Sequence, residues 1–354
     1  MMKYRMKWMR CWLVLPFLCL SVSAHANNPS STLRILTWED YIDPDVVQAF
    51  ESEYKTKIQF TYFESDDERD EILLKPNARF DLAITSGHSL SLFLFRGLLD
   101  PLDYEAMPNV SVIDERWSSA FRGAEFYGVP YFWGTLGVAY RKDLLKTPIQ
   151  SWMDMLKPNV ALHGKIAMLD TAADVVAVAL KGLGYSMNSG NLEHYSAAEE
   201  LLKTQRQYVG RYETSDLDET APLVTGDVVA SMMFNGDALM LQEENENIEF
   251  VLPKEGGPLW VDYFVISRNS TKKKLATQFL DFINRPEIAA QNAQYVYYPS
   301  PNKAAEKLLP DEFKQNAVVY PDQRSLALSE FFEAQPPRIT KLVKDIYEEL
   351  VSED

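Results

Sequence analysis

Short apolar runs alternate with helical stretches from residue 33 onward. Leu33 to Trp38 and Lys57 to Phe63 have the length and composition of strands, and Asp43-Pro44 between them begins an amphipathic helix. A charged helical stretch from about Asp66 to Leu74 leads into Phe80 to Thr85, which predicts a buried strand. Strands that alternate with helices in this way indicate a parallel sheet with crossover helices.

The alternation resumes beyond an aromatic stretch, Tyr127 to Tyr140, and gives way to a mostly helical tail after a strand at Trp260 to Ser267. The elements predicted between these two points are a helix at Ser151 to Leu156, a strand at Lys165 to Leu169, helices near Ala172 to Leu183 and Leu192 to Tyr208, a strand at Val228 to Phe234, a helix at Asp237 to Gln242 and a strand at Ile248 to Leu252. We therefore expect an α/β protein with two units and a tail that returns to each.

The first 26 residues have the layout of a secretory signal peptide. Four basic residues and no acid precede an apolar run at Cys11 to Leu20, and Ala24-His25-Ala26 supplies a small-x-small cleavage pattern. The run is too short to cross a bilayer. We expect export to the periplasm with cleavage after Ala26; the alternative is an uncleaved membrane anchor.

Charge and residue usage narrow the function further. The chain has 35 Lys and Arg against 51 Asp and Glu, a net charge of −16, and the predicted leader removes only basic residues, so nucleic acid is not an expected partner. Both cysteines lie in that leader, which excludes a thiol nucleophile or a disulfide from the mature chain. His88, His163 and His194 are far apart and form no zinc motif. We expect no metal and no cofactor.

Aromatic and acidic residues recur together where predicted strands end, and ligands of open α/β sheets bind beyond the carboxyl ends of the strands. These groups are Trp38-Glu39-Asp40-Tyr41, Ser86-Gly87-His88, Asp170-Thr171 with Asp174, Phe234-Asn235-Gly236-Asp237, and Trp260 to Asp262. A linear polyamine needs carboxylates for its ammonium groups and flat aromatic faces for its methylene stem, and aromatic faces also attract ammonium by about 0.5–2 kcal/mol. Each group alone also fits core packing or an acid at a helix start.

The order of these motifs resembles the bacterial periplasmic spermidine/putrescine-binding proteins, the extracellular solute-binding components of transporters. The matching segments run through nearly the whole mature chain: Trp38-Glu39-Asp40-Tyr41-Ile42, Phe63-Glu64-Ser65, Phe80-Asp81-Leu82, Gly128 to Gly134, Ser151-Trp152, Leu183-Gly184-Tyr185-Ser186, Asn235-Gly236, Pro253 to Gly257, Trp260-Val261-Asp262 and Tyr298 to Asn302. The resemblance implies two α/β lobes that close on a ligand, with chain crossings near Leu136 and Val261. The implied division is residues 31–136 plus 261–306 for lobe 1 and 137–260 plus 307–354 for lobe 2.

The resemblance also implies the ligand residues. Trp38, Asp40, Tyr41 and Ser86 would come from one lobe, Asp174 and Phe234 from the other, and Trp260, Asp262 and Tyr298 would complete the site. Asp262 is the expected charge partner of a ligand amine. His88 and Asp170 are further candidates. His88 stands where spermidine-binding relatives have Tyr, and Thr171 replaces an Asp of those relatives, for which Asp170 or Glu333 could compensate.

Phe234 replaces a Trp of those relatives, so the polyamine is left open among spermidine, norspermidine and putrescine. We hypothesise that His88 makes the affinity depend on pH, since only the neutral imidazole ring can accept a hydrogen bond from an ammonium.

Three functions remain. The first is presentation of a polyamine to a membrane permease, as the substrate-binding component of an ABC transporter. The second is sensing, in which the loaded protein signals to a membrane receptor that controls cyclic di-GMP, as the norspermidine-sensor branch of the family does. The third is a secreted hydrolase that uses a carboxylate pair such as Asp170 and Asp174. We expect a monomeric binding protein rather than an enzyme.

Overall fold

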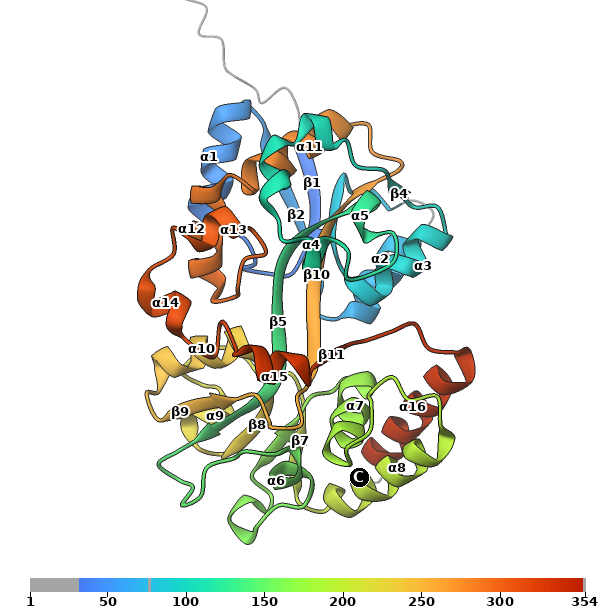
Figure 1. Cartoon of the computed structure of the whole chain (residues 1–354), viewed down its shortest axis with the longest axis vertical. Helices are drawn as coiled ribbons and strands as arrows, with labels where there is room; N and C mark the ends of the chain where they lie inside the picture. The colour runs from blue at the N-terminus through green and yellow to red at the C-terminus, as the bar shows by residue number, and fades with distance from the viewer. Residues whose placement is uncertain (1–31, 76–77, 353–354) are drawn as a thin grey trace, which may run out of the picture.

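A computed structural model describes residues 32–75 and 78–352. The predicted signal peptide and its cleavage site therefore lie outside the described residues. Among those residues, no helix is both long enough and apolar enough to span a membrane. The chain forms two α/β lobes, one above the other in Figure 1.

The first lobe is built on a parallel sheet. Strand β1 (Thr32–Thr37) pairs with both β2 (Lys57–Tyr62) and β3 (Leu82–Ser86), and all five residues of β3 are buried. The connecting helices are α1 (Pro44–Tyr54), α2 (Asp66–Leu74) and α3 (Gly87–Phe95). The strands and helices predicted for this part of the chain are confirmed. Asp43 caps α1 by accepting from the backbone N–H of Asp45, as its position before Pro44 suggests.

Two long strands join the lobes. β5 (Gly128–Arg141) and β10 (Pro258–Ser267) pair antiparallel and run from one lobe into the other (Figure 1). β10 also pairs antiparallel with β3, a direction that the sequence left open. Every residue of β5 is buried, which explains why its sequence shows no hydrophobic alternation.

The second lobe continues the sheet beyond β5. Its order from β5 is β8 (Ala230–Phe234), β6 (Ile166–Met168) and β7 (Val209–Tyr212), with β9 (Ile248–Val251) also on β5. β6 lies parallel to both of its neighbours, whereas β8 and β9 are antiparallel to β5. The helices of this lobe are α6 (Trp152–Leu156), α7 (Ala172–Gly182), α8 (Leu192–Arg206), α9 (Pro222–Thr225) and α10 (Asn235–Glu244).

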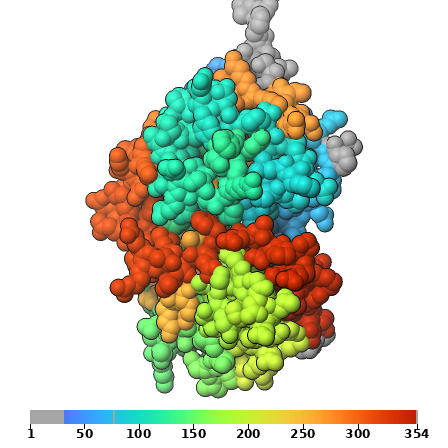
Figure 2. All heavy atoms as spheres, turned by 45° about the vertical axis from the view of Figure 1, so that its right-hand side comes forward, coloured from blue at the N-terminus to red at the C-terminus, as the bar shows by residue number. Residues whose placement is uncertain are grey.

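The C-terminal tail visits both lobes, as the sequence predicts. Helices α11 (Lys273–Ile283) and α12 (Pro286–Val296) pack on α1, and α16 (Pro337–Val351) packs on α7 and α8. Figure 2 shows the segment that ends in α16 (red) at the junction of the lobes. The remaining elements are β4 (Leu99–Asp100), η1 (Tyr104–Ala106), η2 (Pro108–Val112), α4 (Glu115–Ser118), α5 (Ala124–Tyr127), η3 (Val160–Leu162), α13 (Lys303–Glu306), α14 (Asp311–Gln315), α15 (Gln323–Ala327) and β11 (Glu330–Phe331).

Each lobe has its own hydrophobic core. Along β5, Trp133 packs with the first core and Leu136 with the second. β10 contributes Val261 and Phe264 to the first core. Separate cores joined by paired strands allow the lobes to move relative to each other about these crossings. The residue boundaries of the lobes given above remain a prediction.

Candidate functional site

Asp262 lies where β10 crosses between the lobes, directly opposite Ser86 of β3. Its carboxylate is buried, with 7% of the residue exposed, and accepts a hydrogen bond from the Tyr41 hydroxyl at 3.1 Å. Burial and the nearby Asp66 carboxylate raise the pKa of Asp262 to about 7, although the Arg69 guanidinium and the hydrogen bonds from Tyr41 and Trp38 oppose this shift. Burial therefore favours the neutral form of Asp262, and a cation beside it would stabilise the ionised form.

Asp174 brings a second buried acid from the other lobe. It occupies the first turn of α7 and is 9% exposed. Burial, with Asp66 as a second cause, raises the pKa of Asp174 to about 7. None of the described residues donates a hydrogen bond to the Asp174 carboxylate. Because Asp66 of the first lobe acts on both Asp174 and Asp262, the three carboxylates lie near one another between the lobes, and this region is called the cleft.

Aromatic rings border these acids. Trp260 of β10 stands edge-on to Phe234, the last residue of β8, with centroids 6.1 Å apart, and to Tyr298 at 4.8 Å. The Trp260 indole N–H is buried and has no hydrogen-bond partner among the described residues. Gly134 lets the ring lie against β5, because a Cβ there would come within 2.5 Å of Trp260 Cζ2. Trp38 packs edge-on to Phe63 at 4.3 Å.

Tyr41 and Tyr298 are fixed by their own contacts. The Tyr131 hydroxyl donates to the backbone carbonyl of Tyr41 at 3.0 Å, and the Tyr41 ring packs edge-on to Tyr298. The Tyr298 hydroxyl donates to Asp237 at 2.5 Å. Burial raises the pKa of Asp237 to about 6 against the effect of that hydrogen bond. The predicted aromatic residues thus lie around Asp262 from three separate segments of the chain.

The sequence interpretation missed a buried arginine, Arg69 of α2, which is 0% exposed. Its guanidinium donates to Asp66, to Asp70 at 2.6 and 2.9 Å, and to Ser89 at 2.9 Å. A charged helical stretch is typical of a solvent-facing surface, so nothing in its composition marks Arg69 as buried. The available signal is its spacing of four residues from Leu73, since both lie on the buried face of α2.

His88 lies beside the same acids. Its side chain is 45% exposed, and its Nε2 is 3.9 Å from Asp66 Oδ2. The ring also packs edge-on to Phe332, which follows β11, at 6.2 Å. The surrounding protein lowers the pKa of His88 by desolvation, and the attraction of Asp66 does not overcome that effect. The imidazole is therefore neutral at neutral pH.

Two of the predicted ligand residues have a different neighbourhood. Asp40 is exposed, has a φ of +50°, and lines a cavity of about 210 Å³ together with two other predicted ligand residues, Trp38 and Tyr41. Asp170 is exposed and accepts a hydrogen bond from the Thr214 hydroxyl at 2.8 Å. Both carboxylates are exposed, whereas Asp174 and Asp262 are buried. Their contact with a ligand stays a prediction.

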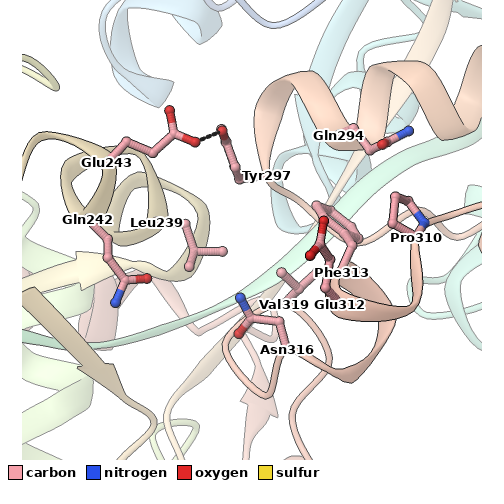
Figure 3. A pocket seen from close by; sticks show the side chains of 10 residues that line it. All are labelled: Leu239, Gln242, Glu243, Gln294, Tyr297, Pro310, Glu312, Phe313, Asn316 and Val319. Atoms are coloured by element: carbon pink, nitrogen blue, oxygen red, sulfur yellow. Dashed lines mark hydrogen bonds between the residues drawn. The ribbon is translucent and has the colours of Figure 1, made fainter. Parts of the chain in front are cut away.

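A further cavity of about 430 Å³ opens between α10 and α14 (Figure 3). Tyr297 donates a hydrogen bond across it to Glu243 of α10. None of the predicted ligand residues lines this cavity. In the part of the chain that the structure describes, no group of three side chains could hold a metal ion. The arrangement that can bind a charged solute is thus the acidic and aromatic cleft between the lobes.

Comparison with known proteins agrees with this architecture. A family model described as bacterial extracellular solute-binding protein matches residues 45–319. The chain belongs to this family. It is 30% identical over 329 residues to the spermidine/putrescine-binding periplasmic protein of Salmonella typhimurium, across 92% of this chain and 93% of the relative. It is 31% identical to the norspermidine sensor of Vibrio cholerae, across 88% of this chain and 85% of that protein.

Solved structures give the same result for the fold. A putative spermidine/putrescine ABC transporter from Listeria monocytogenes superposes with a TM-score of 0.82 at 33% identity, over 90% of this chain and 98% of that one. A second relative, the substrate-binding protein PotD from Streptococcus pneumoniae, also reaches a TM-score of 0.82, at 28% identity over 91% of this chain and 99% of that one. The family and the two-lobed fold expected from the sequence are confirmed.

Proposed function

We propose that this solute-binding protein captures a linear polyamine between its lobes and presents it to a membrane permease, as the substrate-binding component of an ABC transporter. The observation that carries the proposal is the pair of buried carboxylates, Asp174 and Asp262, whose pKa values are both raised to about 7. A buried carboxylate without a cation is unstable, whereas an ammonium paired with it forms a charge-assisted hydrogen bond.

The aromatic residues supply the rest of the recognition. Trp260 and Phe234 are half-buried and stand edge-on to each other, so part of each ring remains open to a ligand. Methylene groups between ammonium charges can pack on these faces, and the charges themselves gain about 0.5–2 kcal/mol from the rings. The relatives named for spermidine and putrescine support a ligand of this chemistry.

Closure of the lobes is the proposed mechanism. Asp262 belongs to a crossing strand and Asp174 to the second lobe, so a ligand that pairs with both stabilises the closed form over the open form. A membrane partner that recognises only the closed form would then distinguish loaded from empty protein. We further propose that the protein acts in the periplasm as a monomer, without nucleic acid and without catalysis.

Binding is tested by calorimetry and thermal denaturation with putrescine, spermidine, norspermidine and spermine. A ligand that binds the native state raises its stability by mass action, by about 2.7 kcal/mol at a concentration one hundred times Kd. The expected result is saturable binding of at least one polyamine, with the compound recovered unchanged. No binding across the panel would refute the proposal, and turnover of the ligand would favour the hydrolase.

Sensing remains the second candidate function, because the relative named as a norspermidine sensor is as similar to this chain as those named for binding. Deletion of the gene distinguishes the two. Loss of radiolabelled polyamine uptake supports transport. Unchanged uptake with an altered cyclic di-GMP level supports signalling to a membrane receptor.

A further inference from the structure

The side chain of Arg69 is a buried cation beside the acidic residues of the cleft. Arg69 is 0% exposed, and its guanidinium is held by Asp66 and Asp70, by the hydroxyls of Ser86 at 3.3 Å and Ser89 at 2.9 Å. The face of the Phe63 ring lies 5.7 Å from the guanidinium carbon. Two carboxylates, two hydroxyls and an aromatic face form the set of partners that a ligand ammonium would need.

These partners are already engaged by the guanidinium and by one another. Asp66 accepts from Arg69 with one oxygen and from the Ser86 hydroxyl at 3.0 Å with the other. Asp70 accepts from Arg69 with one oxygen and from Ser89 at 3.1 Å with the other. Ser86, expected to contact ligand, is thus bound within the protein.

The electrostatics separate the acids into two groups. Burial raises the pKa of Asp66, but the charge of Arg69, with smaller effects of His88 and Ser86, brings that pKa below its ordinary value. By contrast, the pKa values of Asp174 and Asp262 are both raised to about 7. The Arg69 charge therefore holds down the pKa of Asp66, whereas its effect on Asp262 does not overcome burial, and the pKa of Asp174 is raised by burial and by Asp66.

We propose that Arg69 determines ligand specificity by filling one cation subsite of the cleft, which leaves subsites at Asp174 and Asp262 for the two ammonium groups of a linear diamine. This inference rests on the proposed function, because it assumes that the cleft binds a polyamine. A triamine would have to place its third ammonium outside the pair of acids. The protein would accordingly distinguish diamines from triamines by their number of ammonium groups, because the Arg69 guanidinium occupies the position that a third ammonium would take.

The test compares putrescine, a diamine, with spermidine, a triamine, by calorimetry at about pH 8. Wild-type protein should bind putrescine more tightly. Arg69→Met frees Asp66 and Asp70, and one new charge-assisted hydrogen bond should improve the affinity for spermidine relative to putrescine by about ten- to a hundredfold. Arg69→Lys keeps a cation at the subsite and should keep the preference for putrescine. The matched control is Arg211→Met, which removes an arginine whose side chain is 44% exposed on β7.

Loss of Arg69 leaves two carboxylates uncompensated and can prevent folding. The double variant Arg69→Met/Asp70→Asn removes one charge of each sign, and the same shift toward spermidine is expected from it. An unchanged ratio of affinities in the folded variants, or a wild-type preference for spermidine, overturns the role of Arg69 while leaving polyamine binding intact. Failure of the wild type to bind either amine instead refutes the proposed function itself.

Discussion

Because the Asp262 carboxylate is buried, replacing it should change both the stability of the folded protein and its affinity for a polyamine. Asp262→Asn removes the charge and keeps a carbonyl oxygen that can accept the hydrogen bond from Tyr41. The substitution also preserves the side-chain volume, so packing around β10 should change little. The variant therefore removes the charge and one of the two acceptor atoms while it keeps the size of the side chain.

The size of the effect follows from the pKa. Asp262 is 7% exposed, and its pKa is raised from 3.8 to about 7. Each unit corresponds to about 1.4 kcal/mol, so ionising Asp262 costs the folded state about 4 kcal/mol. The folded protein retains this proton while the unfolded chain releases it, so the loss of stability begins near pH 4 and is complete above about pH 7.

We therefore expect Asp262→Asn without ligand to be more stable than wild type at about pH 8, by up to about 4 kcal/mol, and to differ less near pH 5. Its polyamine affinity should fall by about a hundredfold or more, because an ammonium would lose its buried partner. Urea unfolding at both pH values measures stability, and calorimetry measures affinity. Asp216→Asn, at an exposed site, is the matched control. Equal urea midpoints at pH 8, or an affinity within about threefold of wild type, would refute this reasoning.

Three further predictions follow from the same site. Polyamine affinity should fall as the pH is lowered from about 8 to about 6, because the two buried carboxylates with pKa values near 7 must release protons to pair with ammonium. Calorimetry in buffers of different ionisation enthalpy measures the protons released, and release of none would contradict this prediction. His88→Tyr should alter the pH profile of affinity only below about pH 6.5, since the pKa of His88 is lowered; a difference between pH 7 and 8 would count against it. Gly134→Ala should lower stability by about 1–3 kcal/mol, because its Cβ would meet Trp260; thermal denaturation should show no such loss for Gly190→Ala, where the space is open.

Much of the fold could be predicted from local pattern. Apolar runs and helix caps place β1, α1, β2, α2 and β3 within one or two residues of their observed bounds. The relative direction of β10 could not be predicted in this way, because strand direction depends on the path of the long connections and not on the residues of the strand. It is this antiparallel pairing that sets Asp262 opposite Ser86.

Some residues of the candidate site could likewise be predicted from local sequence, and others could not. Trp38, Asp262 and Trp260 are recognisable because ligands of open α/β sheets bind beyond the carboxyl ends of the strands, and because their motifs resemble a known family. Asp40 and Asp170 share that local signal, yet both are exposed. Whether an acidic side chain at a strand end points into the cleft depends on the backbone conformation of the residues that follow and on packing of the opposite lobe. A few neighbouring residues in the sequence determine neither.

The sequence by itself determined the α/β class, the pattern of elements, the acidic character of the chain and the residue types of the cleft. Only the tertiary structure decided which buried carboxylates are paired with a cationic side chain of the protein. Arg69 and Asp66 are three residues apart on a charged helix, an arrangement usually exposed to water. Arg69 is buried where α2 packs against β3, and Asp174 is buried on α7, which packs against the crossing strand β10. Burial strengthens the interaction between charges and determines which carboxylates need a ligand, and it arises from segments distant in the chain.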